Sequence, residues 1–150
     1  LPISQVIWQT GKYYIEEAEQ AAKAFKTRNL VVTAFVSRMD YAYAVADVVV
    51  SRAGASSISE LCLLAKPAVL VPSPNVAEDH QTKNAMALVK KDAAILIKDG
   101  EAIEKMIPET LRLLSDEKKM AALSKNILKL AEKKSAERIV QEVSNLLSKK

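Results

Sequence analysis

Short apolar runs alternate with segments of helical periodicity along most of the chain, and this alternation constrains the fold more than any other feature of the sequence. The apolar runs are Ile3–Thr10, Leu30–Phe35, Val48–Val50, Ala68–Val71 and Ala94–Ile97. The helical segments between them are Tyr13–Lys26, Met39–Ala46, Ser56–Ala65 and Glu78–Lys91. Strands that alternate with helices form parallel sheets with right-handed crossovers. The sequence therefore predicts an α/β fold with one doubly wound parallel sheet.

The last third of the chain is predicted to be helical throughout. Its segments with apolar residues at helical spacing are Glu101–Leu114, Asp116–Ala131 and Ser135–Leu147. Pro108 lies inside the first of them and predicts a kink or a break, because proline has no N–H to donate. In the last segment the apolar residues fall on one face. Trp8 and Phe25, near the other end of the chain, are expected in the core.

Composition limits the class of protein. A chain of 150 residues, of which 49% are hydrophobic, is long enough for one domain with a core and too apolar for a disordered segment. The net charge is +4, and lysines alternate with glutamates on the C-terminal helices. This pattern is typical of solvated helix faces rather than of a nucleic-acid interface. No apolar run approaches the ~18 residues of a membrane span.

Side chains that support metal or thiol chemistry are few and scattered. Cys62 is the single cysteine, so an internal disulfide is excluded, and its apolar neighbours predict a core residue with a raised thiol pKa rather than a nucleophile. His80 is the only histidine, and no acidic pair has Asp-x-Asp spacing. The P-loop pattern is also absent. We therefore expect neither a metal ion nor another cofactor.

The most informative segment runs from the apolar strand Val48–Val50 into a turn and a helix. The turn Ser51–Ala55 offers small residues and Gly54, which can take a positive φ angle. Ser56 and Ser57 are suited to capping the helix that follows. A helix that begins at the carboxyl end of a parallel strand presents unpaired N–H groups and a positive dipole end. This arrangement predicts an anion site.

Two charged residues accompany this turn. Arg52 adds a positive charge beside it, and Glu60 lies in the helix, where its carboxylate could accept hydrogen bonds from a diol such as ribose. Alternatively, Gly54 only makes the turn, Arg52 is solvated, and Glu60 interacts favourably with the helix dipole. The residues alone leave both interpretations open.

A second polar segment, Pro72–Asn84, lies between two apolar ones. His80, Gln81 and Asn84 lie at the start of its helix, and His80 and Asn84 share one face. An imidazole and two carboxamides provide both donors and acceptors, the chemistry that recognises sugar hydroxyls. The alternative is that Asp79 caps the helix while His80 and Gln81 are solvated. The pattern alone does not decide between them.

Several segments of the chain also follow a specific order. They are Phe35-Val36, Met39-Asp40, Ala46-Asp47-Val-Val-Val-Ser-Arg-Ala-Gly-Ala55, Ser59-Glu60, Pro67-Ala-Val-Leu-Val-Pro72 and Asp79-His-Gln-Thr-Lys-Asn-Ala85. Taken together they resemble the C-terminal domain of the MurG family, peptidoglycan glycosyltransferases of glycosyltransferase family 28. These enzymes move N-acetylglucosamine from UDP-N-acetylglucosamine to lipid-linked muramyl pentapeptide. The resemblance implies a Rossmann-like half of a GT-B fold, the half that holds the donor.

The resemblance also implies roles for individual residues. The family's donor-binding positions match Val36, Arg52, Ala53, Gly54, Ala55, Glu60, His80, Gln81 and Asn84. The backbone of Val36 is expected to pair with uracil, and the turn that begins at Arg52 is expected to face the diphosphate. Glu60 matches the acid that binds the ribose hydroxyls. The last three residues match positions that read the sugar, although some members have glutamine in place of His80.

Parts of the family's enzyme have no counterpart in this sequence. The chain begins without an initiator methionine, and the family's first glycine-rich loop and N-terminal acceptor domain precede it. We therefore interpret residues 1–150 as a single C-terminal UDP-sugar-binding domain, truncated at its N-terminal edge. The resemblance implies an inverting, metal-independent transfer whose base lies in the absent domain, so we expect no transfer by this chain alone. It also implies a cytoplasmic protein whose full-length form is peripheral on the bacterial inner membrane.

Two other classes of function remain as alternatives. The chain could be a separate donor-binding subunit that works with a partner chain, as in the two-subunit dolichol-linked N-acetylglucosamine transferase. It could also be a non-enzymatic interaction module that uses the apolar face of Ser135–Leu147 to bind a partner helix. The length of the parent reading frame would decide the first, and light scattering would identify the second, because an uncovered apolar stripe favours self-association.

Overall fold

The computed structural model describes residues 5–25 and 29–148, which form two compact units, Leu1–Val45 and Ala46–Lys150. Each unit is an alternation of parallel strands and helices, so the α/β class predicted from the sequence is confirmed. The first residues expected in a strand, Ile3 and Ser4, and the last residue of the first expected helix, Lys26, lie outside the described residues.

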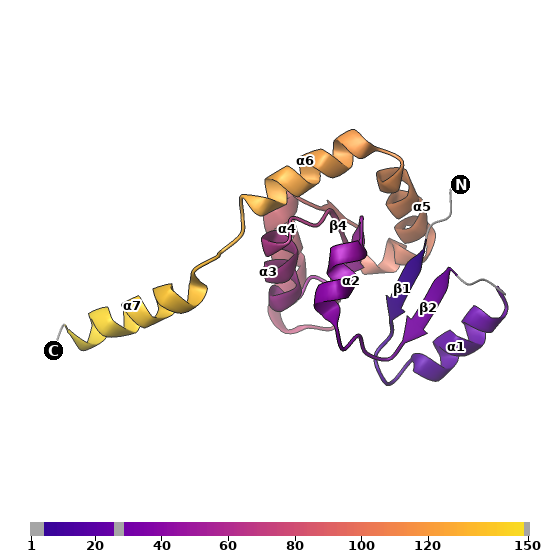
Figure 1. Ribbon diagram of the computed structural model, residues 1–150, viewed down its shortest axis with the longest axis horizontal. Helices are drawn as coiled ribbons and strands as arrows, with labels where there is room; N and C mark the ends of the chain where they lie inside the picture. Colours follow the sequence, from indigo (N-terminus) through magenta and orange to yellow (C-terminus); the bar gives the residue numbers. More distant parts are fainter. Residues whose placement is uncertain (1–4, 26–28, 149–150) are drawn as a thin grey trace. The chain divides into compact units, whose positions relative to one another are not determined.

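In its described residues, the first unit contains two strands and two helices. They are β1 (Val6–Gln9), α1 (Ile15–Lys23), β2 (Leu30–Thr33) and α2 (Met39–Val45). β1 and β2 pair in parallel, with Val6 opposite Leu30 and Gln9 opposite Thr33. α1 connects them and packs on β2, as Figure 1 shows. This is the βαβ connection that parallel strands require.

The side chains of this unit are mostly accessible to solvent. Every residue of β1 is exposed, and Ala18 of α1 is the unit's one buried residue among those described. Trp8 and Phe25 are 44% and 72% exposed, so the prediction that they lie in the core is wrong. The reason is geometric, because a sheet of two strands with one helix against it covers little apolar surface.

The second unit is built on three parallel strands in the order β3-β4-β5. They are β3 (Val49–Ser51), β4 (Ala68–Leu70) and β5 (Ile95–Leu96), with Ser51 opposite Leu70 and Leu70 opposite Leu96. The connecting helices are α3 (Ala55–Leu63) and α4 (His80–Val89), the latter preceded by the 3₁₀ turn η1 (Ala77–Asp79). β4 is the middle strand and is completely buried. Its uninterrupted apolar sequence is typical of a strand covered on both faces.

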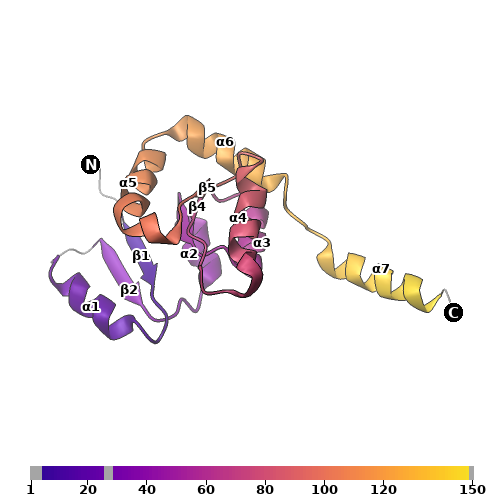
Figure 2. The ribbon, with the colours of Figure 1, turned by 180° about the vertical axis from the view of Figure 1, so that it is seen from behind.

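Three helices follow the last strand. A 3₁₀ turn, η2 (Asp99–Glu101), leads into α5 (Ala102–Leu114), and α6 (Glu117–Leu128) and α7 (Ser135–Leu147) come after it. α5 and α6 contact each other, and α6 also contacts α3 (Figure 2). The central cluster of the core takes its members from β4, from the residues directly after β4 and β5, and from α5 and α6, namely Val69, Val71, Ile97, Leu113 and Leu123. Each such side chain contributes about 1.5–3 kcal/mol of hydrophobic stabilisation.

α5 continues through Pro108, so the break allowed by the sequence does not occur. Proline in a helix interior removes one hydrogen bond and crowds the preceding turn. Leu113 is buried in the core, and Met106 packs against it. Their burial on both sides of the proline favours one continuous helix.

α7 has the bounds that its apolar periodicity predicts, yet none of its residues is buried. Its apolar side chains are exposed, namely Ile139, Val140, Val143, Leu146 and Leu147. The helix begins after Lys134, and no side chain caps it. None of the helices in the described residues combines the length and the apolar character needed to span a membrane.

The strands are divided between two sheets rather than joined in the single sheet expected from the sequence. One sheet belongs to each unit. In the described residues β2 pairs with β1, and β3 pairs with β4. A sheet is defined by backbone hydrogen bonds between strands, which periodicity along one strand does not specify. The assignment of all 150 residues to one domain therefore stays a prediction.

Candidate functional site

The carboxyl ends of the three strands of the second unit lie at one edge of its sheet, and polar residues follow each of them. Arg52 comes directly after β3, Ser73 lies shortly after β4, and Asp99 shortly after β5. Because parallel strands all end at the same edge, residues distant in sequence can meet there. Gln81 and Asn84 of α4 also reach this edge.

Arg52 lies across the end of β4, held by three acceptors. Its Nη1 donates to the carbonyl oxygens of Val71 at 3.2 Å and Pro72 at 3.4 Å, and it forms an ion pair with Oδ1 of Asp99. The side chain stays 56% exposed. One end of the guanidinium group is therefore held within the protein, while more than half of the side chain is accessible to solvent, so both interpretations of Arg52 stay open. Asp99 was not singled out from the sequence, although it follows a predicted strand at this same edge.

The turn after β3 is fastened to α4 by two carboxamides. Oε1 of Gln81 accepts hydrogen bonds from the N–H groups of Ala53 at 3.2 Å and Ser73 at 2.9 Å. Nδ2 of Asn84 donates to the carbonyl oxygen of Ala53 at 3.2 Å. Ala53 is completely buried, so both of its backbone polar groups depend on these side chains. Gln81 thus holds together the two loops that follow β3 and β4.

The first turn of α3 begins earlier than the sequence suggested. Gly54 is the N-cap residue, with φ −67° and ψ 149°, and no side chain caps the helix. Ser56 and Ser57 therefore lie inside the first turn, and the prediction that they cap the helix is wrong. Ile58 donates the first bond to Gly54, so the N–H groups of Ala55 and the two serines precede the regular hydrogen bonding. These groups and the helix dipole form the positive end expected of an anion site.

Gly54 does not use the conformational freedom for which the sequence singled it out. Its φ angle is negative, and an added Cβ would meet only the Oγ of Ser57, at 3.9 Å. An alanine side chain therefore fits here in the structure. A requirement for glycine at this position has to come from something that approaches the backbone closely, such as a ligand.

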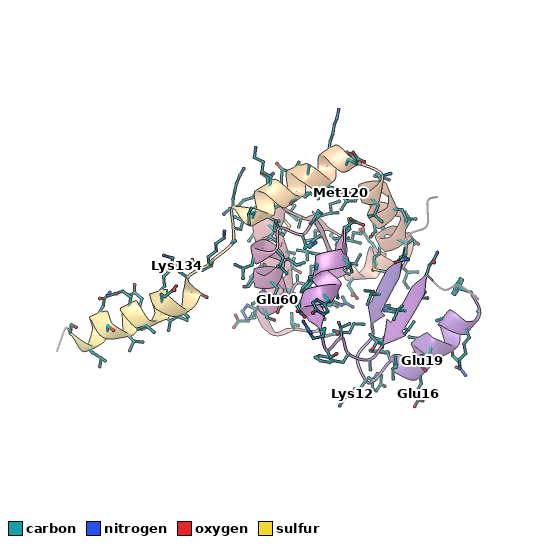
Figure 3. All side chains as sticks on the ribbon, in the orientation of Figure 1. Lys12, Glu16, Glu19, Glu60, Met120 and Lys134 are labelled. Atoms are coloured by element: carbon teal, nitrogen blue, oxygen red, sulfur yellow. The ribbon has the colours of Figure 1, made fainter. Side chains whose placement is uncertain are left out.

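Glu60, labelled in Figure 3, lies in the second turn of α3, and its side chain is exposed. Its position along the helix, after the first turn, is the one expected from the sequence. The helix continues for one further turn and ends at Leu63, because Pro67 and the strand that follows require an extended chain.

His80 begins α4 in an unusual backbone setting. Glu78 and Asp79, which precede it, have φ angles of 51° and 53°, the left-handed region that non-glycine residues seldom adopt. The His80 side chain is exposed, and its Nε2 lies 3.6 Å from Oε2 of Glu78. Asp79 is the N-cap residue but does not accept a capping hydrogen bond, so the alternative in which it caps the helix is wrong.

Val36 belongs to the first unit, in the loop between β2 and α2. Its N–H donates to Oε1 of Gln9 at 2.8 Å. Further along the loop, Arg38 forms an ion pair with Asp40, and its Cζ atom lies 3.8 Å from the ring centre of Tyr41. The guanidinium group of Arg38 holds the pKa of the Asp40 carboxyl below its usual value. Gln9 was not predicted as a partner of Val36.

Cys62 is buried in α3, as its apolar neighbours predict, and this burial raises the pKa of its thiol. A raised pKa disfavours the thiolate, the nucleophilic form. Within residues 5–25 and 29–148, no three side chains of the His, Cys, Asp and Glu types converge on a possible metal position.

Comparison with known proteins identifies the family. The model of the glycosyltransferase family 28 C-terminal domain matches residues 2–142. The chain belongs to this family. Two curated relatives of this chain have the name UDP-N-acetylglucosamine–N-acetylmuramyl-(pentapeptide) pyrophosphoryl-undecaprenol N-acetylglucosamine transferase. The one from Parabacteroides distasonis is 56% identical over 97% of this chain, and the one from Bacteroides thetaiotaomicron is 57% identical over 95%.

A solved structure supports the same assignment. The crystal structure of Acinetobacter baumannii MurG superposes on this chain with a TM-score of 0.82 and 26% sequence identity. The match covers 97% of this chain and 42% of the MurG chain. The two curated relatives are matched over 40% and 38% of their own length. This chain therefore spans about two fifths of the length of the proteins that it resembles.

The structure brings together only some of the predicted donor-binding residues of this family 28 domain. Arg52, Ala53, Gly54, Gln81 and Asn84 share one edge of the second unit, where Ala55 begins α3. Glu60 and His80 are exposed on α3 and α4, and Val36 lies in the other unit. The ligand-binding roles of all these residues remain predictions.

Proposed function

We propose that this chain is the donor-binding domain of a UDP-N-acetylglucosamine-dependent transferase that acts on lipid-linked muramyl pentapeptide in peptidoglycan synthesis. The observation that carries the proposal is the 56% identity over 97% of the chain to a curated transferase of that name. The acceptor and the catalytic base are assigned to the rest of a longer enzyme, so this chain alone binds the donor without transferring its sugar.

The edge of the second unit supports a site for the diphosphate. The N–H groups of Ala55 and Ser56 and the dipole of α3 offer positive charge there, and Arg52 adds a full one. In an inverting transfer an acceptor hydroxyl attacks the anomeric carbon while UDP departs, so negative charge grows on the diphosphate. Fixed donors at that position stabilise the leaving group without a metal ion.

The hydrogen bonds that the carboxamides of Gln81 and Asn84 already make limit which atoms they can offer to the sugar. Because Oε1 of Gln81 accepts two backbone hydrogen bonds, its Nε2 is left to donate to a sugar oxygen. Asn84 donates through Nδ2, which leaves its Oδ1 as an acceptor for a sugar hydroxyl. His80 offers an exposed imidazole at the same end of α4. The site thus contains both kinds of partner that a hydroxyl group needs.

The nucleoside is assigned to Glu60 and Val36. The exposed carboxylate of Glu60 is suited to accept hydrogen bonds from the two ribose hydroxyls. The N–H of Val36 already donates to a carboxamide oxygen of Gln9, an acceptor of the same kind as a uracil carbonyl. Uracil would replace Gln9 as the partner of this N–H.

Calorimetric titration with UDP tests the proposal. We expect saturable binding of UDP, weaker binding of ADP and CDP, and no change when a chelator is added. Glu60→Ala should weaken UDP binding about tenfold, because two hydrogen bonds to a carboxylate are lost. Glu104→Ala removes an exposed glutamate from α5 and serves as the control.

Equal affinity of the Glu60 variant and the parent for UDP would refute the ribose assignment. Absence of UDP binding by the parent would contradict the proposed function. Appreciable sugar transfer by this chain to a lipid acceptor would contradict the assignment of the base to another part of the enzyme.

A further inference from the structure

The carboxylate of Asp99 is the one charged partner among the three acceptors that hold Arg52. We propose that Asp99 is a positioning residue of the donor site, which fixes Arg52 so that its remaining N–H groups can bind the diphosphate. This inference rests on the proposed function. It assigns a role to a residue outside the predicted donor-binding set.

The hydrogen bonds of Arg52 use one end of its guanidinium group. All three involve Nη1, whereas Nη2 and Nε take no part in them. Nη2 carries two N–H groups and Nε carries one, in the planar arrangement that binds two oxygens of a phosphate at once. A guanidinium group anchored through Nη1 therefore keeps its bidentate edge for an anion.

The two carbonyl groups alone are weak anchors. The distances from Nη1 to the oxygens of Val71 and Pro72 are 3.2 and 3.4 Å, near the long end of the range for hydrogen bonds. Arg52 has a long side chain with many rotamers, and an exposed guanidinium group held only by such bonds samples several of them. The bond to Asp99, which is charge-assisted, selects one position.

The position of Asp99 in the fold suits this role. It opens η2, two positions after Ile97, whose N–H donates to the carbonyl oxygen of Leu70 of β4. Arg52 follows β3, on the other side of β4. The ion pair therefore spans the end of the middle strand and joins the loops after the two outer strands of this sheet. Ile97 is buried, so the loop that carries Asp99 begins from the core.

The exposure of the pair separates a positioning role from a structural one. The side chains of Arg52 and Asp99 are 56% and 36% exposed, and pairs this accessible add little to folding stability. Removal of the carboxylate should therefore alter anion binding far more than the melting temperature. If Asp99 served only to neutralise Arg52, its removal would instead strengthen anion binding.

The test compares Asp99→Ala and Asp99→Asn in the whole chain. Titrations use UDP, uridine and inorganic pyrophosphate, and the melting temperature of each variant is measured alongside. Asp99→Ala should weaken UDP and pyrophosphate binding about fivefold, the loss expected when a bidentate contact is no longer held in place. Uridine binding should not change. Asp99→Asn keeps an oxygen that accepts from Nη1 and should bind UDP within about twofold of the parent.

Two further variants complete the test. Glu101→Ala removes a neighbouring carboxylate of η2, whose partner is Lys105 at 3.1 Å, and should leave all three affinities unchanged. In an Arg52→Ala background, Asp99→Ala should cause no additional loss, because Asp99 acts through Arg52. An additional loss of the same fivefold size would overturn the inference.

The remaining outcomes distinguish this inference from the proposed function. Unchanged or tighter UDP binding by Asp99→Ala would overturn the positioning role, and so would an equal loss of uridine binding. A parent chain that binds pyrophosphate without preferring uridine nucleotides would contradict the proposed function, while the effect of Asp99→Ala on pyrophosphate would still decide the role of Asp99. A parent that binds neither ligand would overturn both.

Discussion

β1 and β4 are both short, apolar, parallel strands, yet all of β1 is exposed and all of β4 is buried. β4 lies between two other strands, and helices of the second unit cover it. Within the described part of the chain, β1 pairs with β2 alone. The comparison teaches that the two units can support binding groups to different degrees. The edge of the second unit proposed to bind the diphosphate, where Arg52 and Gln81 lie, is attached to a packed core, whereas the loop that carries Val36 extends from a largely exposed pair of strands.

The largest expected effect is on folding stability, and it should differ between β4 and β1. Leu70→Ala in β4 should lower the free energy of unfolding by about 2–5 kcal/mol, because it leaves a cavity in a fully buried position. Ile7→Ala in β1, where the side chain is 50% exposed, should cost less than about 1.5 kcal/mol. Urea denaturation followed by circular dichroism measures both. Equal losses would mean that β1 is buried in solution and would remove the contrast.

A smaller effect should come from the side chain that fastens the edge proposed to bind the diphosphate. Gln81→Ala leaves the N–H groups of Ala53 and Ser73 without their acceptor, which should cost about 1–3 kcal/mol of folding stability. Gln141→Ala on α7 is the matched control, because the Gln141 side chain donates to Asn145 in an exposed pair and its loss should cost less than about 0.5 kcal/mol. The same denaturation experiment compares them. A Gln81 variant as stable as its control would show that the edge is not held by this carboxamide.

The smallest effect on stability concerns two glycines, one in each unit. Gly11 has φ +78°, so Gly11→Ala should cost about 1 kcal/mol although space is available for the methyl group. Gly54 has φ −67°, and Gly54→Ala should leave stability unchanged within about 0.5 kcal/mol. If a diphosphate approaches the backbone there, the Gly54 variant should still lose UDP affinity in calorimetry. A Gly54 variant that keeps its UDP affinity would locate the diphosphate elsewhere.

Much of the fold was predictable because its determinants are local. Every expected strand and helix is present in the described residues, with ends that differ by a few positions. α7 was predicted with its observed bounds because its apolar spacing and flanking lysines are visible in the sequence. The errors in the fold have a common cause. The possible break at Pro108 and the burial of Trp8 were inferred from residue type, whereas the continuity of α5 and the exposure of Trp8 depend on what packs around them.

The candidate site was predictable in part. Residue types and spacing were sufficient to select Arg52 and Gln81, which meet at the expected edge. They could not indicate that Oε1 of Gln81 is used within the protein, because one of its partners, Ala53, lies 28 positions away in the loop after β3. Asp99 was missed for a similar reason, since it lies 47 positions from Arg52 and no short motif includes both. The helix start at Ala55 was missed because serine was given more weight as a cap than the extended Gly54.

The sequence by itself determined the alternation of parallel strands and helices, and membership of the glycosyltransferase 28 family, because periodicity and ordered motifs are properties of neighbouring residues. Only the tertiary structure decided which strands are buried, that α4 fastens the turn after β3, and that a carboxylate after β5 holds Arg52. These features depend on hydrogen bonds and packing between residues far apart in the chain, and their geometry is set only when the strands of a sheet are placed side by side.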